Sequence, residues 1–107
     1  MFKKRMKIGL IESVTLENKK TYRAKIDTGA DSSSIDINLA KHLGDKEIVE
    51  HKIVRSALGR HSRPTIWLEI EFQGKTFKEK FTLSDRTHMK YKVLIFFSHW
   101  RILQLTL

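Results

Sequence analysis

The chain has 107 residues, a formal net charge of +9 from 21 Lys and Arg against 12 Asp and Glu, and no cysteine. This length is enough for one small hydrophobic core and too short for two, so we expect a single domain over residues 1–107. The lack of cysteine excludes disulfides, thiol nucleophiles and cysteine-bound zinc, and it fits a reducing compartment.

The positive charge is spread along the chain rather than gathered in one block. Only residues 3–7 and 86–92 are densely basic, and neither has the aromatic spacing of a base-stacking platform, so we expect no nucleic-acid partner. At residues 1–14 a short apolar run is interrupted by Glu12. We therefore expect neither a signal peptide nor a membrane span, and we expect a cytoplasmic protein.

Alternating apolar and polar residues predict strands along most of the chain. Residues 6–16 favour one or two strands, residues 21–26 alternate strictly, and residues 48–57 favour another strand. Residues 65–72 and 75–83 alternate on either side of Gln73-Gly74, which predicts a β-hairpin.

Helix has two candidate places. Asn38 is positioned to cap a single turn over residues 39–43 that ends at Gly44, and Ser98 is positioned to cap a helix over the closing residues. Short strands, regular turns and little helix predict a mostly β fold, a small closed antiparallel β-barrel with one short C-terminal helix.

Asp27 follows the strand at residues 21–26 and precedes Thr28 and Gly29. One interpretation is a plain turn, because Asp and Thr bond their own backbone and Gly accepts a positive φ. The other is a carboxylate held by a rigid strand for acid–base chemistry. Two such carboxylates a few ångströms apart share a proton, so that the pair acts as base towards water and as acid towards a peptide carbonyl.

The stretch Ile26-Asp27-Thr28-Gly29-Ala30-Asp31-Ser32-Ser33 resembles the active-site motif of the aspartic proteases. That resemblance implies an endopeptidase that hydrolyses peptide bonds of protein substrates. Because the motif occurs once, the water would be activated between the two Asp27 carboxylates of a homodimer. Chain length and β content resemble the single-lobe, retropepsin-like proteases.

Later segments also resemble one retropepsin-like group, the bacterial and archaeal proteins named ATP-dependent zinc proteases. The positions that carry this likeness are Arg55, Ser56, Gly59, Thr82, Leu83, Asp85, Arg86, Met89 and Tyr91. The resemblance implies a link to a ribosomal-protein glutamate ligase system.

By the same resemblance Asp27, Thr28 and Gly29 are catalytic, with Thr28 hydrogen-bonding across the dimer and Gly29 letting backbone amides approach. Ala30, Asp31 and Gly59 would bind substrate, with the loop around Gly59 forming a flap; a plain hairpin turn at Gly59 is the alternative. For Asp85 and Arg86 the alternative is a surface connection in which they pair with each other or with solvent.

Two positions depart from the group's pattern. Phe96 and Phe97 stand where the group has Gly-Arg, so a tight backbone crossing would be overpacked and Asp31 would lose its arginine partner, for which Arg101 is a substitute. This departure favours an alternative function, a catalytically impaired module that binds peptides or acidic ribosomal-protein tails. No histidine spacing indicates a zinc site and no phosphate loop is present, so we expect no metal and no cofactor.

Overall fold

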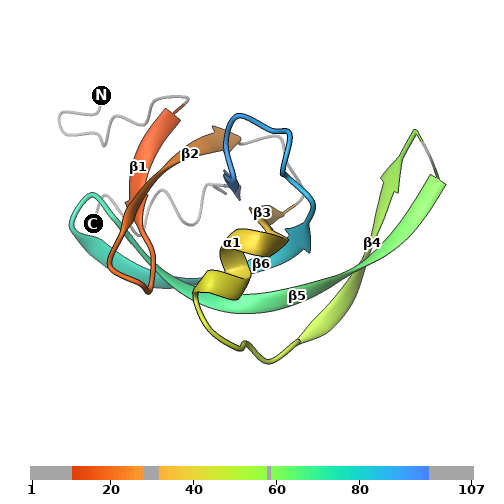
Figure 1. Ribbon diagram of the computed structural model, residues 1–107, viewed down its shortest axis with the longest axis horizontal. Coiled ribbons are helices and arrows are strands. Elements are labelled where there is room, and N and C mark those ends of the chain that lie inside the picture. The colour runs from red at the N-terminus through yellow and green to blue at the C-terminus, as the bar shows by residue number, and fades with distance from the viewer. Residues whose placement is uncertain (1–10, 28–31, 58, 97–107) are drawn as a thin grey trace, which may run out of the picture.

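The computed structural model describes residues 11–27, 32–57 and 59–96, apart from the side chain of Ser56 (Figure 1). The described ranges form strands and one short helix. In chain order these are β1 (Ile11–Thr15), β2 (Thr21–Asp27), β3 (Ser33–Asp36), α1 (Ile37–His42), β4 (Glu50–Ser56), β5 (Gly59–Phe72), β6 (Lys75–Ser84) and β7 (Val93–Phe96).

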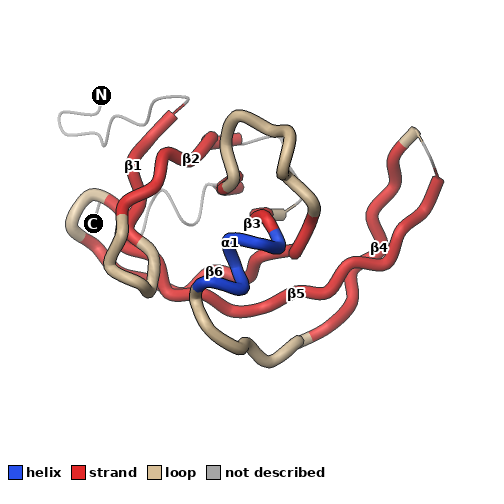
Figure 2. The backbone as a smooth tube through the Cα atoms, in the orientation of Figure 1, coloured by secondary structure: helices blue, strands red, loops and turns tan. Residues whose placement is uncertain are grey.

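All described strands belong to one mixed sheet with the order β1-β2-β7-β3-β6-β5-β4. The sheet curls until β1 meets β5 at Thr15 and Glu71 (Figure 2). Five of the seven described strand pairs are antiparallel, as predicted, but β2–β7 and β3–β6 are parallel, so the prediction of an antiparallel barrel is confirmed only in part. Alternation within a strand predicts which face is buried but not the direction of a neighbour distant in sequence. The sheet closes on itself only through the pairing of Thr15 with Glu71, so the described strands do not form a complete barrel.

The β5–β6 hairpin supplies much of the core, as its alternation predicts. The side chains of Ile66, Leu68, Ile70 and Phe72 are buried, whereas Trp67 between them is exposed. The turn residues Gln73 and Gly74 have φ values of 49° and 80°. Both positive values are those of a type I′ turn, whose twist matches the flanking strands.

Helix α1 begins two residues earlier than the sequence suggests. Its N-cap is Asp36, whose Oδ2 accepts from the backbone amides of Asn38 and Leu39 at 3.1 and 3.3 Å. The prediction of Asn38 as the cap is therefore wrong, since the buried carboxylate of Asp36 already satisfies the first free amides of the helix. The predicted C-terminal helix lies outside the described residues.

Glu17 ties the β1–β2 turn to two distant segments. Its carboxylate pairs with Lys46 and accepts from the backbone amide of Glu69 at 2.8 Å. Burial alone would raise the pKa of Glu17, but the two hydrogen bonds and the charges of Lys46 and Lys78 together hold the pKa below its usual value. The ionised carboxylate therefore stabilises the fold above its unfolded-state pKa, and this contribution is lost as pH falls through the lower folded-state pKa.

We expect Glu17→Gln to lower the thermal unfolding midpoint at pH 7. As pH falls into the acid range, the midpoint of the variant should approach that of the parent. Thermal unfolding followed by circular dichroism across pH 3–8 measures this difference. Glu71→Gln, an exposed change on β5, is the control and should show no such convergence. A gap between Glu17→Gln and the parent that stays constant towards acid pH would contradict the assignment.

Candidate functional site

Asp27 ends strand β2 and is paired in parallel register with Phe96, the last residue of β7. On its other edge β7 pairs with β3, where Ser34 faces Leu94. Asp27 and the first residues of β3 therefore flank the same end of β7. The predicted site residues Thr28, Gly29, Ala30 and Asp31 lie outside the described residues.

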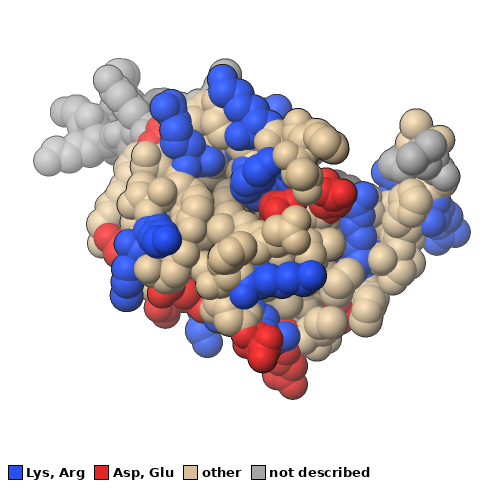
Figure 3. All heavy atoms as spheres, viewed as in Figure 1, with Lys and Arg blue, Asp and Glu red and all other residues tan. Residues whose placement is uncertain are grey.

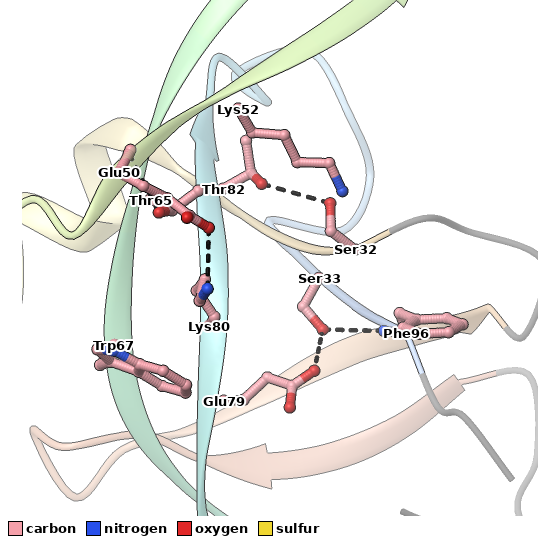
Figure 4. A pocket seen from close by; sticks show the side chains of 10 residues that line it. All are labelled: Ser32, Ser33, Glu50, Lys52, Thr65, Trp67, Glu79, Lys80, Thr82 and Phe96. Carbon is pink, nitrogen blue, oxygen red and sulfur yellow. Dashed lines mark hydrogen bonds and ion pairs between the residues drawn. The ribbon is translucent and has the colours of Figure 1, made fainter. Parts of the chain in front are cut away.

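A hydrogen-bonded chain fixes the end of β7 beside Asp27. The Ser33 hydroxyl donates to Glu79 Oε2 at 2.7 Å and accepts from the backbone amide of Phe96 at 3.0 Å (Figure 4). Ser33 is buried, so these bonds are shielded from water. The side chain of Phe96 is half-buried and lines a cavity. The loop over residues 28–31, under which overpacking is expected, lies outside the described residues. Phe97 and Arg101 lie outside the described residues.

Strands β4 and β5 form a hairpin whose tip extends away from the rest of the molecule (Figure 1). Gly59 lies at this tip, paired with Ser56, and its φ of 117° is one that side-chain-bearing residues rarely adopt. Gly59 is therefore needed for the turn itself, and the turn belongs to a projecting hairpin.

A hollow of about 470 Å³, here called the cationic groove, lies beneath this hairpin. Lys and Arg side chains gather beside the hollow between the hairpin and the body of the molecule (Figure 3). None of its described lining residues is acidic; four are basic, namely Lys52, Arg55, Arg63 and Arg86. The hydroxyls of the groove come from Ser32, Ser34, Thr82 and Ser84. These hydroxyls pair with one another, Ser32 with Thr82 and Ser34 with Ser84. The basic side chains attract anionic groups and supply donors to hold them.

A second cavity of about 310 Å³, here called the aromatic pocket, adjoins the groove. The two cavities share Ser32, Lys52 and Thr82. Trp67 and Phe96 lie on opposite sides of the aromatic pocket, and Ser33 and Glu79 lie between them (Figure 4). The face beside the end of β2 thus has two adjoining cavities of different chemistry.

The loop between β6 and β7, residues 85–92, is bound to the body of the protein through Arg86. Its backbone amide donates to Asp36 Oδ1 at 2.7 Å, and its Nε donates to the carbonyl of Tyr91 at 3.0 Å. Asp85 instead accepts from the amide of Thr87 at 3.0 Å. The expectation of a surface connection therefore holds for Asp85, which is exposed, but is wrong for Arg86, which is bound to Asp36 and Tyr91.

The Lys92 ammonium group stabilises this loop by hydrogen bonds to its backbone. It donates to the carbonyl oxygens of Arg86, Thr87 and Met89 at 2.8, 2.5 and 3.0 Å. Burial lowers the pKa of Arg86, and the nearby Asp36 carboxylate opposes that shift. The contacts hold Arg86 at the wall of the cationic groove, a physical role for the loop that its sequence pattern does not reveal.

The sequence pattern does not mark the basic residues of the groove as a set. Lys52 and Arg63 face each other across β4 and β5, and this follows from the same register that pairs Ser56 with Gly59 at the turn. Locating that turn would have paired them. Arg86 joins them only through the parallel β3–β6 pair and the Asp36 contact, for which no local signal exists.

Within the described residues, no group of three or more His, Asp or Glu side chains is arranged to hold a metal ion. Of the five histidines, His42, His51, His61 and His88 are exposed there, and His99 lies outside the description. No helix in the described part of the chain has the length and apolar character needed to cross a membrane.

Comparison with solved structures places the fold. The EIAV protease complexed with the inhibitor HBY-793 has a TM-score of 0.65 at 16% identity, over 95% of this chain and 88% of that one. The simian foamy virus (mac) protease has a TM-score of 0.62 at 13% identity, over 80% of this chain and 86% of that one. A Legionella pneumophila protein of unknown function (DUF785) has a TM-score of 0.58 at 24% identity, over 91% of this chain and 86% of that one.

No protein family and no curated protein matches the chain by sequence. The structural likeness is nevertheless extensive, because it spans most of this chain and most of each of the three solved structures. The identities, all below one quarter, limit what it shows to the fold. The chain has the retropepsin-like protease fold.

Proposed function

We propose that the protein is a retropepsin-like aspartic endopeptidase that acts as a homodimer. The observation that carries the proposal is the place of Asp27, at the end of β2 in a chain with the fold of viral proteases. A strand end is a rigid support for a carboxylate, and the adjoining cavities leave room for a peptide.

In this proposal the two Asp27 carboxylates of the dimer share a proton and hold a water between them. The ionised carboxylate takes a proton from the water as it attacks the peptide carbonyl, and the protonated one donates to the carbonyl oxygen. Thr28 and Gly29 position the pair, and Ala30, Asp31 and the hairpin around Gly59 contact the substrate chain. The sequence resemblance to ATP-dependent zinc proteases supports these roles without fixing the substrate.

A dimer is the necessary condition for this chemistry, so we expect sedimentation velocity to show a concentration-dependent shift from monomer to dimer. One Asp27 per chain supplies only one carboxylate, and a single carboxylate cannot serve as base and acid in the same step. Asp27→Asn should sediment like the parent and so separates assembly from catalysis. A protein that stays monomeric at the highest concentration would contradict the proposed enzyme.

A second function is favoured by the cationic groove. Four basic residues and no acidic one among its described lining residues suit an acidic peptide, such as the tail of a ribosomal protein, bound without hydrolysis. Phe96 supports this alternative, because the ATP-dependent zinc proteases have glycine there. The two functions differ in turnover, and the Asp27 variant discussed below separates them.

A further inference from the structure

The aromatic pocket differs in charge from the groove beside it. Two lysines and two glutamates line it, so their formal charges cancel, and Lys80 pairs with Glu50 at 2.8 Å. Its hydroxyls already have partners: Ser33 with Glu79, Ser32 with Thr82, and Thr65 with the Glu50 carbonyl. An added ionic ligand would have to break existing pairs, whereas an uncharged one would not.

Two rings remain as surfaces that a ligand can cover. The side chain of Trp67 is 47% exposed although it lies on a central stretch of β5, and Lys80 Nζ is 5.4 Å from its ring centroid. Phe96 supplies the second ring across the pocket (Figure 4). Covering exposed aromatic surface with another apolar side chain is favourable in water.

The two cavities share part of their walls, and this limits the distance between two side chains of one peptide that could occupy them. In an extended peptide, residues i and i+2 point to the same side, about 6.6–6.8 Å apart. Cavities that share Ser32, Lys52 and Thr82 are close enough for such neighbouring side chains. A peptide lying along the groove would therefore place alternate side chains in the two cavities.

We infer that the aromatic pocket is a side-chain subsite for a large apolar residue, aromatic above all, two positions from the residue that occupies the cationic groove. This inference rests on the proposed function in that a peptide occupies the groove. It adds the requirement that the peptide carry a large apolar side chain at one position, which charge attraction alone would not impose. Trp67 and Phe96 are the residues that determine specificity at this subsite.

The test is a binding measurement in the Asp27→Asn background, so that hydrolysis cannot deplete the ligand. Two labelled peptides of equal length and charge carry a glutamate, and two positions away either Phe or Ala. By fluorescence anisotropy we expect the Phe peptide to bind about tenfold more tightly, the effect of partly burying one aromatic side chain.

The variant Trp67→Ala should reduce that preference to less than about threefold. Trp67→Phe keeps a ring and should restore most of the preference. Met89→Ala removes another exposed apolar side chain, 52% exposed and outside both cavities, and should keep the parent's preference. Circular dichroism of each variant checks that the fold is retained.

Equal binding of the two peptides by the parent, or an undiminished preference in Trp67→Ala, would overturn the subsite. Neither result depends on turnover. If the chain with intact Asp27 cleaves peptides without preferring Phe, the subsite fails and the proposed enzyme stands. If the preference depends on Trp67 and cleavage is absent, the enzyme fails and the subsite stands.

Discussion

Asp27→Asn should abolish peptide hydrolysis and leave the folded protein intact. The amide is nearly the same size as the carboxylate but can neither take a proton from water nor donate one as a carboxylic acid does, so the paired site loses both its base and its acid. We expect a loss on the order of 10³-fold or more. Cleavage of a peptide library followed by mass spectrometry measures the loss. Thermal unfolding should be close to that of the parent, since Asp27 is only partly buried at a strand end.

The matched control is Asp45→Asn, the same chemical change at an exposed position in the loop between α1 and β4. It should cleave at the parent rate. Cleavage by Asp27→Asn at that rate would refute the aspartic mechanism. A third pattern, in which parent and Asp27→Asn bind acidic peptides equally and neither cleaves them, would establish the binding function instead.

Sequence patterns were sufficient where structure depends on neighbours in the chain. The strand at residues 21–26 and the hairpin on either side of Gln73-Gly74 are confirmed, because alternation and turn chemistry act locally. The retropepsin-like fold expected from the resemblance is confirmed by the solved structures. The placement of Asp27 at the end of a strand follows from the same local pattern.

Sequence patterns did not predict structure where a side chain hydrogen-bonds a segment distant in the chain. Asp36 reads in the sequence as an ordinary polar residue ahead of a short helix, and Asn38 has an equally good capping side chain. What distinguishes Asp36 is that its second carboxylate oxygen accepts from Arg86, fifty residues later. Pairing of β3 with β6 in parallel register creates that meeting, and no local rule predicts a parallel pair.

The buried carboxylate of Asp36 should therefore be among the largest single contributions to stability. It accepts three backbone amides, from Asn38, Leu39 and Arg86, at 3.1, 3.3 and 2.7 Å. Its own amide donates to the Lys92 carbonyl at 2.9 Å, so the residue joins β3, α1 and the β6–β7 loop. Removing the carboxylate leaves several amides unpaired in a site that water barely reaches.

We expect Asp36→Ala to lower the free energy of unfolding by about 3 kcal/mol or more, from the lost cap and the unpaired amides together. Asp36→Asn keeps one carbonyl oxygen for the cap but turns an amide group towards a donor, so its cost should be smaller. Urea denaturation at one fixed protein concentration measures both, because a dimer would make stability depend on concentration.

Asp85→Ala is the matched control, since Asp85 neighbours Arg86 but accepts only from Thr87 at the exposed surface. It should cost well under about 1 kcal/mol. If Asp36→Ala cost no more than Asp85→Ala, the amides would have found water or other partners and the three-way junction would not hold the loop. A larger cost for Asp36→Ala than for Asp85→Ala would instead mean that Asp36, on β3, holds Arg86 at the wall of the cationic groove. The shape of the groove would then depend on Asp36 without Asp36 contacting any ligand.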